Sequence, residues 1–170
     1  MAKGCTLATV FAGLLSAGLI SAASHARADS PSLATEIKAT YLDKFGDFVD
    51  WPAGALRGPN DPLRLCVVSD DPLGAVLEQA ARGQRIGSHP VQLLRLNRSD
   101  RVEDCHILFA AGSSRESVLQ KVKGVPVLTV TDGVNDPAAR GMINFVELSN
   151  HVRFQIDAAS DVSQIGVAGL

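Results

Sequence analysis

Short apolar runs alternate with helix-forming segments through the middle of the chain, and this alternation constrains the fold more than any other feature. The segments 70–83 and 113–124 read as helices, opened by Asp or Ser and closed by Gly83 and Gly124. The apolar runs between them have the length of buried strands and cover residues 63–69, 89–97, 106–112 and 125–133. Such alternation predicts an α/β fold with a mainly parallel sheet and helices on both faces.

Two further strand-like runs, 141–148 and 151–158, follow and are separated only by Ser149–Asn150. A two-residue connection of this kind is typical of a tight antiparallel hairpin. The sequence therefore predicts a sheet of about five to six strands that ends in a C-terminal hairpin.

A first helix is predicted over residues 32–49, ahead of the sheet. Ser32 can cap it, and its apolar residues recur at i, i+3 and i+4 spacing. Pro52 ends the element, and Trp51 is expected in the core. The Pro- and Gly-rich stretch 52–62 is predicted to be a loop.

Residues 1–28 have the layout of a secretory signal peptide. Lys3 precedes an uncharged apolar run at 5–20, and Ala26–Ala28 fits a small-x-small cleavage site. A retained membrane anchor is the alternative, but the run is short for a membrane span. We expect an exported protein with residues 29–170 as a single domain.

The charge balance argues against nucleic acid or anionic lipid as a partner. The whole chain has 16 basic and 18 acidic side chains, and removal of Lys3 and Arg27 with the signal peptide makes the domain more acidic. No basic block remains in residues 29–170.

Cys66 and Cys105 are the two cysteines that remain after cleavage, because Cys5 leaves with the signal peptide. Cysteines in even number usually pair in an oxidising compartment, so one disulfide is expected. The neighbouring pair Cys105–His106 also raises a nucleophile or a metal site as alternatives. Its place at the start of an apolar strand favours a structural cysteine and a hydrogen-bonded strand-end histidine.

No catalytic, metal or cofactor motif stands out. The sequence lacks the G-x-S-x-G elbow, the G-x-G-x-x-G fingerprint and the G-x-x-x-x-G-K phosphate loop. We therefore predict no catalytic residues, no metal and no cofactor.

Polar residues follow three of the predicted strands, where ligands of open parallel sheets bind. The polar residues after the strands 63–69 and 106–112 also stand at the starts of helices, whose free N–H groups can hold an anion. Simple helix capping is the alternative. Arg153 on the hairpin is either a ligand clamp or an ordinary exposed arginine. The ligand-binding candidates are Asp70, Asp71, Ser113, Ser114, Asp132 and Arg153.

Several segments, taken in order, resemble the YfiR-like family of periplasmic proteins. They are "IKATYLDKFGDFVDWP" (37–52), "LCVVSDDPLG" (65–74), "CHILF" (105–109), "PVLTVTD" (126–132), "GMINFV" (141–146) and "VRFQID" (152–157). The resemblance covers nearly all of residues 29–170. It implies a repressor that binds the periplasmic sensor region of an inner-membrane diguanylate cyclase and holds it inactive, which lowers cyclic-di-GMP and biofilm formation. It also implies a disulfide between Cys66 and Cys105.

Two departures from the family pattern limit this implication. The chain lacks the further cysteine pair that some members carry near the C-terminus. The segment after residue 157 is short and interrupted by glycine, which puts the family's longer last helix in doubt.

Three function classes remain. The leading hypothesis is a regulatory binding protein that is not an enzyme. The second is a periplasmic small-molecule binding module that reports to another membrane receptor, and the third is a hydrolase that uses Asp70, Asp132 or His106. A small-molecule ligand and a homodimer both stay open.

Overall fold

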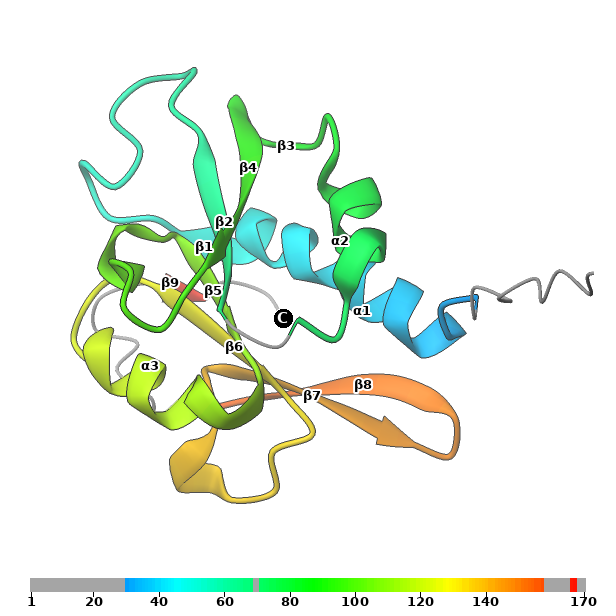
Figure 1. Cartoon of the computed structure of the whole chain (residues 1–170). Helices are drawn as coiled ribbons and strands as arrows, with labels where there is room; N and C mark the ends of the chain where they lie inside the picture. Colours follow the sequence, from blue (N-terminus) through cyan, green and yellow to red (C-terminus); the bar gives the residue numbers. More distant parts are fainter. Residues whose placement is uncertain (1–29, 69–70, 158–165, 168–170) are drawn as a thin grey trace, which may run out of the picture.

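The computed structural model describes residues 30–68, 71–157 and 166–167 (Figure 1). In chain order its elements are α1 (Leu33–Lys44), the 3-10 turn η1 (Phe45–Phe48), β1 (Val49–Asp50), β2 (Leu63–Val68), α2 (Gly74–Ala81), β3 (Arg85–Ile86), β4 (His89–Leu96), η2 (Val102–Asp104), β5 (Ile107–Ala110), η3 (Gly112–Ser114), α3 (Arg115–Lys121), β6 (Leu128–Asp132), η4 (Pro137–Ala139), β7 (Ile143–Leu148), β8 (His151–Ile156) and β9 (Gly166–Val167).

Seven strands form one sheet in the order β3-β4-β2-β5-β6-β7-β8. The five strands β4, β2, β5, β6 and β7 run parallel, and β3 and β8 pair antiparallel at the two edges. The predicted mainly parallel α/β sheet is thus confirmed, but the predicted number of strands was too low. The additional strand is β3, which pairs with the start of β4 across Gly87. Two residues are too few to carry a periodic signal.

The predicted C-terminal hairpin is confirmed as β7–β8. Leu148 pairs with His151 at the turn, and Ser149 and Asn150 between them have φ angles of 50° and 61°. Positive φ at both central residues matches the twist of a two-residue hairpin, and Asn adopts it more easily than most residues.

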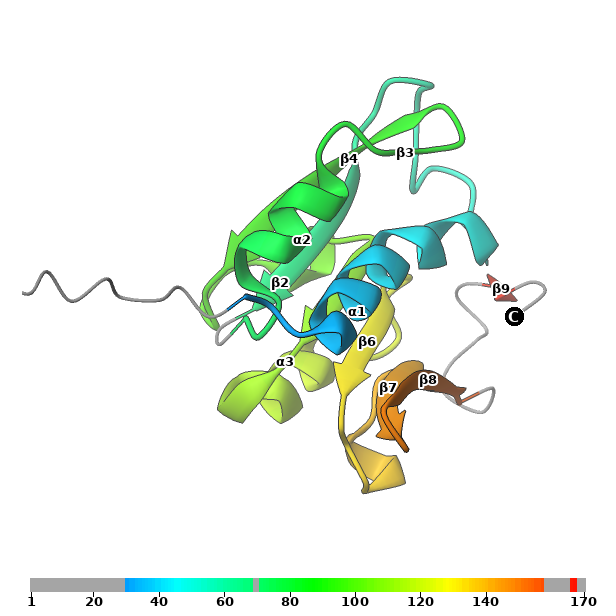
Figure 2. The same cartoon turned by 90° about the vertical axis from the view of Figure 1, so that its right-hand side faces the viewer.

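Helices cover both faces of the sheet, as predicted. Figures 1 and 2 show α1 and α2 side by side on one face and α3 on the other. The strand order reverses between β2 and β5, because β2 leads through α2 to β4 while β5 leads through α3 to β6. Ligands of such sheets bind beyond the carboxyl ends of the strands at this reversal.

Two apolar clusters pack against the opposite faces of the sheet. Along β2, Leu63, Leu65 and Val67 join the larger cluster beneath α1 and α2, whereas Cys66 and Val68 join the smaller cluster beneath α3. This alternation follows from the period of two along a strand. It explains why parallel strands buried on both faces have nearly continuous apolar sequences.

The first helix begins where predicted and ends earlier. The Ser32 side chain accepts a hydrogen bond from the backbone N–H of Thr35 at 3.1 Å, which confirms the cap. The helix ends at Lys44, and the chain continues as η1 into β1. A Cβ at Gly46 would lie 2.4 Å from Ile86 Cδ1, so a larger residue would force the Ile86 side chain of β3 to move. Contacts with residues distant in sequence therefore set this end of the helix.

The short strand β9 pairs antiparallel with β1, Val49 opposite Val167 and Asp50 opposite Gly166. Figure 2 shows β9 beyond the C-terminal end of α1. The other residues of the final segment, 158–165 and 168–170, lie outside the described residues.

Candidate functional site

Asp71, a predicted ligand residue beyond the end of β2, is engaged with neighbouring groups. Its Oδ1 accepts a hydrogen bond from the backbone N–H of Leu73 at 2.8 Å, and its Oδ2 pairs with Arg95 on β4. The Arg95 guanidinium also donates to the carbonyl of Gly74 at 2.8 Å and to Glu78 at 3.2 Å. These contacts tie the start of α2 to β4. The Asp71 carboxylate bonds the N-cap residue Leu73 itself, and α2 has no side-chain cap, so neither the ligand nor the capping prediction is decided here. Asp70, the second candidate here, lies outside the described residues.

The predicted serines follow β5 in the turn η3. Ser113 is exposed, whereas Ser114 is buried at the junction with α3, and its backbone carbonyl accepts a hydrogen bond from the Ser117 hydroxyl at 2.8 Å. Gly112 precedes them with a φ of 65°, which turns the chain sharply after the strand. Their role in ligand binding stays a prediction.

Asp132, at the end of β6, lies beside a lysine that the sequence analysis did not select. The Nζ of Lys38 on α1 lies 2.8 Å from Asp132 Oδ2 and 2.6 Å from Glu147 Oε1 on β7. Lys38 is only 7% exposed. Burial acts to lower the pKa of Lys38, but hydrogen bonds and charges from both carboxylates prevail and raise it. The cluster fixes α1 to the carboxyl edge of the sheet.

Arg153 is exposed on β8 opposite Val146, so it belongs to the edge strand of the hairpin. Asp71 and Asp132 each pair with their own cation, Arg95 and Lys38. The carboxyl edge thus holds most of the predicted residues, but the two described carboxylates among them are engaged within the fold.

A pocket of about 420 Å³ lies at the opposite, amino edge of the sheet. The 52–62 loop forms one wall, and residues at the starts of β2 and β5 form another. Its charged lining residues are Arg57, Asp61, Arg64, Glu103 and Asp104. The sequence pattern does not predict this pocket, because nothing in it shows which loops meet there. The available signal was a Pro- and Gly-rich loop with an arginine and an aspartate, far in sequence from a Cys-His pair.

His106 lies at the base of this pocket and is only 4% exposed. Its Nδ1 accepts a hydrogen bond from the backbone N–H of Arg64 at 3.0 Å, and its Nε2 lies 3.0 Å from the backbone carbonyl of Ala55. Burial lowers the pKa of His106; the Ala55 carbonyl opposes this, and the charges of Arg64 and His89 add to the lowering. The prediction of a hydrogen-bonded strand-end histidine is confirmed.

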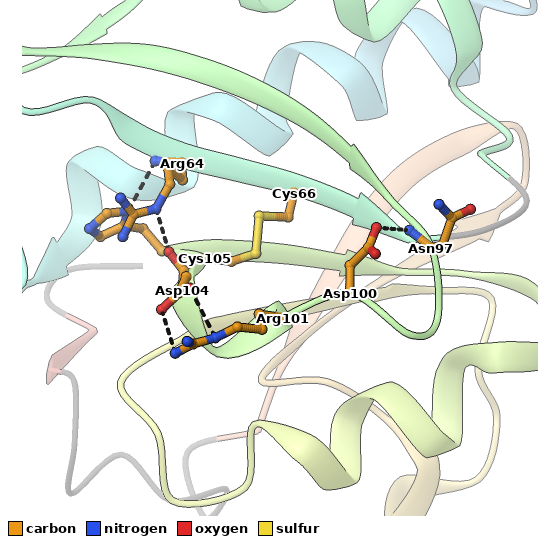
Figure 3. The surroundings of a disulfide bond; sticks show 8 residues. Arg64, Cys66, Asn97, Asp100, Arg101, Asp104 and Cys105 are labelled. Carbon is orange, nitrogen blue, oxygen red and sulfur yellow. Dashed lines mark hydrogen bonds and ion pairs between the residues drawn. A yellow bond between two sulfur atoms is a disulfide. The ribbon is translucent and has the colours of Figure 1, made fainter.

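The disulfide between Cys66 and Cys105 is formed, with the two Cα atoms 6.0 Å apart. Figure 3 shows it between β2 and the segment that leads into β5, close to Arg64 and Asp104. The Arg64 Nε donates to the backbone carbonyl of Asp104, so the same two segments are joined both covalently and by hydrogen bonds. Both cysteines are buried, and Cys105 is turned to Cys66 rather than to its neighbour His106.

An apolar surface lies where α1 meets the edge strand β8. We call Tyr41, Phe154 and Ile156 the α1–β8 surface. Their exposed fractions are 46%, 36% and 37%. The Tyr41 and Phe154 rings lie 6.0 Å apart, and Phe154 also contacts the buried Phe45 with ring centroids at 5.6 Å. Exposed aromatic side chains that rest on a packed core are typical of interaction surfaces.

The described residues contain no helix long and apolar enough to cross a membrane. In the same part of the chain, no group of three or more His, Cys, Asp or Glu side chains is placed to hold a metal ion. The features that remain are a disulfide, a polar pocket and an exposed apolar surface.

The chain belongs to the YfiR/HmsC-like family, whose model matches residues 35–165. The YfiR-like proteins of this family are periplasmic regulators rather than enzymes, and the Cys66–Cys105 disulfide fits an oxidising compartment. The match covers the described fold from α1 to β8, including the disulfide and the pocket. No curated protein matches the sequence.

Proposed function

We propose that the protein is a periplasmic repressor that binds the periplasmic sensor region of an inner-membrane diguanylate cyclase. Binding holds the cyclase inactive and lowers cyclic-di-GMP in the cell. The observation that carries this proposal is membership of the YfiR/HmsC-like family over residues 35–165. The signal-peptide pattern of residues 1–28 supports it, because export would place the domain beside such a sensor region.

The α1–β8 surface supports a docking role for this part of the domain. Tyr41 and Phe154 present large, rigid apolar groups of the type that dominates binding energy at interfaces. Strand β8 forms an edge of the seven-stranded sheet, so its outer backbone groups can receive a partner strand. A domain that binds only the inactive conformation of a sensor region shifts the sensor's conformational equilibrium toward that inactive state. No catalysis by the domain is needed.

The binding step can be tested with the cyclase encoded beside this gene, if its product has a periplasmic region and a GGDEF domain. Isothermal titration of its purified sensor region with oxidised residues 29–170 is expected to show a saturable complex. Phe154→Ser, in the α1–β8 surface, should weaken the complex at least tenfold, because anchor truncations cost upwards of about 1.4 kcal/mol. Arg98→Ser, an exposed position in the β4–β5 connection, should leave it unchanged. Absence of binding by the unsubstituted domain would count against the proposal.

A small-molecule binding function is the second candidate, and the amino-edge pocket favours it. Its volume of about 420 Å³ lies in the range of small-ligand sites. A thermal-shift screen of residues 29–170 against free amino acids, nucleotides and organic acids tests this function. Stabilisation by one compound, lost in Arg64→Gln, would support the pocket as the site.

A further inference from the structure

Strand β8 leaves one edge of the seven-stranded sheet without a neighbour. In the described chain only β7 pairs with it, at the end of the sheet away from β3 and β4 (Figure 1). The register from Leu148–His151 to Ile143–Ile156 is continuous, so no bulge turns this edge away. The strand contains no proline, and Arg153 is its only Lys, Arg, Asp or Glu. Exposed edges are usually protected by bulges, prolines or charges, so the bare edge of β8 points to a covering strand.

The backbone groups that a covering strand would meet belong to Val152, Phe154 and Ile156. The backbone N–H of Asp157 donates to the Met142 carbonyl at 2.9 Å, so Asp157 faces β7. In an antiparallel pair, residues that point both backbone groups at the neighbouring strand alternate with residues that point both away from it. Every second residue before Asp157 therefore also faces β7, and the three residues between them face outward.

The side chains of these three outward-facing residues share one face of the sheet, because side chains alternate along a strand. Val152 packs against the larger apolar cluster, whereas Phe154 and Ile156 are 36% and 37% exposed. Tyr41 on α1 extends this row, with its ring 6.0 Å from that of Phe154. One copy of the chain therefore offers outward backbone groups and apolar side chains along the same edge.

A second copy of β8 matches this edge when the two strands run antiparallel about a two-fold axis at Phe154. Phe154 then lies opposite its own copy, and Val152 of each chain lies opposite Ile156 of the other. Each of these pairs exchanges two backbone hydrogen bonds, because both of its residues point their N–H and C=O groups outward. Registers centred on Arg153 or Gln155 would leave one outward-facing residue of each strand without a counterpart in β8. The pairing about Phe154 therefore satisfies the whole edge.

The polar side chains on the other face fit the same register. Arg153 of each copy lies opposite Gln155 of the other, and His151 lies opposite Asp157, so no like charges meet. The Gln155 Oε1, which accepts a hydrogen bond from the Asn144 side chain at 3.2 Å, has a second lone pair for the guanidinium. A register centred on Arg153 would instead bring two guanidinium groups together, which disfavours pairing.

We propose that the protein forms a two-fold homodimer in which β8 of one copy pairs antiparallel with β8 of the other about Phe154. The two sheets then join into one continuous sheet across the axis. The same surface is used on both copies, so the interface closes on itself and no further strand can add. This inference goes beyond the proposed repressor function and does not depend on it. A chain in the dimer cannot offer the outer edge of β8 to another partner at the same time.

Sedimentation velocity of oxidised residues 29–170 over a range of concentrations measures the association. A reversible equilibrium between monomer and dimer is expected. Phe154→Lys places two ammonium groups opposite each other at the axis and should weaken the dimer by about tenfold or more. Leu148→Lys, at a 57% exposed apolar position of β7, should leave the dimer unchanged. A monomer at every concentration, or a dimer that Phe154→Lys does not weaken, would overturn the proposal.

The register is tested at Gln155, an exposed position on β8, which also covers the case in which Phe154→Lys does not fold. Gln155→Glu keeps the acceptor for Asn144 and places a carboxylate opposite Arg153 of the second copy, on both sides of the axis. The dimer should become about two- to tenfold tighter, and Gln155→Lys should weaken it. If the axis instead passed through Gln155, the two carboxylates of Gln155→Glu would meet and loosen the dimer. A dimer that Gln155→Glu loosens or leaves unchanged would overturn the pairing about Phe154.

Discussion

The Nζ of Lys38 lies 2.8 Å from Asp132 Oδ2, although 94 residues separate them in the chain. This ion pair joins the first helix to the carboxyl end of β6, and Glu147 completes it from β7. Lys38 is the most buried of the three side chains, so its charge depends on both partners.

Removal of the lysine charge should destabilise the domain. Lys38→Met keeps the apolar stem but leaves Asp132 without its buried counter-charge, and we expect a loss of about 1–3 kcal/mol in the free energy of unfolding. Urea denaturation at pH 7 measures this loss, and Lys123→Met, at an exposed position, is the matched control. An equal stability of Lys38→Met and the unsubstituted domain would show that the cluster contributes nothing.

The cluster of Lys38, Asp132 and Glu147 should also make the stability of the domain depend on pH in the alkaline range. The pKa of Lys38 is raised in the folded state, against burial, by its bonds to Asp132 and Glu147. The contribution of Lys38 to the free energy of unfolding is therefore fully present below the ordinary lysine pKa of about 10.4. It is lost as the pH rises through the pKa of Lys38 in the folded state. The stability difference between the unsubstituted domain and Lys38→Met should stay constant from pH 7 to pH 9. It should shrink only above that range, and a difference that vanished near neutrality would contradict this assignment.

Substitution of Asp43 should increase the stability of the domain. This carboxylate is 2% exposed on α1; its Oδ2 has no hydrogen-bond partner in the described chain and lies 3.4 Å from Lys44 Nζ. Burial raises the pKa of Asp43, and Lys44 only partly opposes this. The folded state therefore binds the proton more tightly than the unfolded state, so the carboxylate destabilises the fold at neutral pH.

Asp43→Asn should raise the free energy of unfolding at pH 7 by about 0.5–2 kcal/mol, because it removes a buried charge. The gain should disappear in acid, as the pH falls through the folded-state pKa toward the ordinary aspartate value of about 3.9. Asp47→Asn, at the nearby exposed position in η1, provides the control. Urea denaturation at pH 7 and pH 4 measures both, and a loss of stability in Asp43→Asn at pH 7 would contradict the prediction.

The disulfide should make a large contribution to stability. Cys66 and Cys105 are 39 residues apart, and closure of such a loop in the unfolded chain corresponds to roughly 3–4 kcal/mol in the chain-entropy description. Cys105→Ser should lose about this amount in oxidising buffer and should match the unsubstituted domain in reducing buffer. Denaturant titrations with and without dithiothreitol measure it, and a serine variant as stable as the oxidised domain would refute the bridge's role.

The α1–β8 surface should serve binding rather than folding. Tyr41→Ser removes an exposed ring and should cost less than about 1 kcal/mol of stability while it weakens repression of the cyclase. Leu33→Ser removes a still more exposed apolar group about two turns away on the same helix and should leave repression intact. Cyclic-di-GMP in complemented deletion strains measures this. Equal repression by both variants would place the docking surface elsewhere.

The sequence predicts the parts of this fold that depend on local patterns. The alternation of apolar runs and helix signals predicts the parallel sheet, and Ser149–Asn150 predicts the hairpin, because both rest on neighbours in the chain. Strand β3 and the early end of α1 are not predicted by the sequence, since each depends on contacts between distant segments, such as Gly46 with Ile86.

The same distinction applies to the site. Topology correctly places Asp71 beyond the end of β2 and Asp132 at the end of β6, but their partners Arg95 and Lys38 come from other elements. No local pattern reveals that such carboxylates are already paired. The amino-edge pocket was missed for the same reason, because the contact of His106 with Ala55 joins positions 51 residues apart.

The most direct test of the proposed function is the cyclic-di-GMP content of a strain in which this gene is deleted. The account predicts a rise in the deletion strain, with return to the parental level when the full chain is expressed in trans. Where the neighbouring gene encodes a diguanylate cyclase with a periplasmic region, a further deletion of that gene should abolish the rise. Unchanged cyclic-di-GMP after deletion of this gene alone, under conditions in which the cyclase is expressed, would contradict the assignment as a repressor.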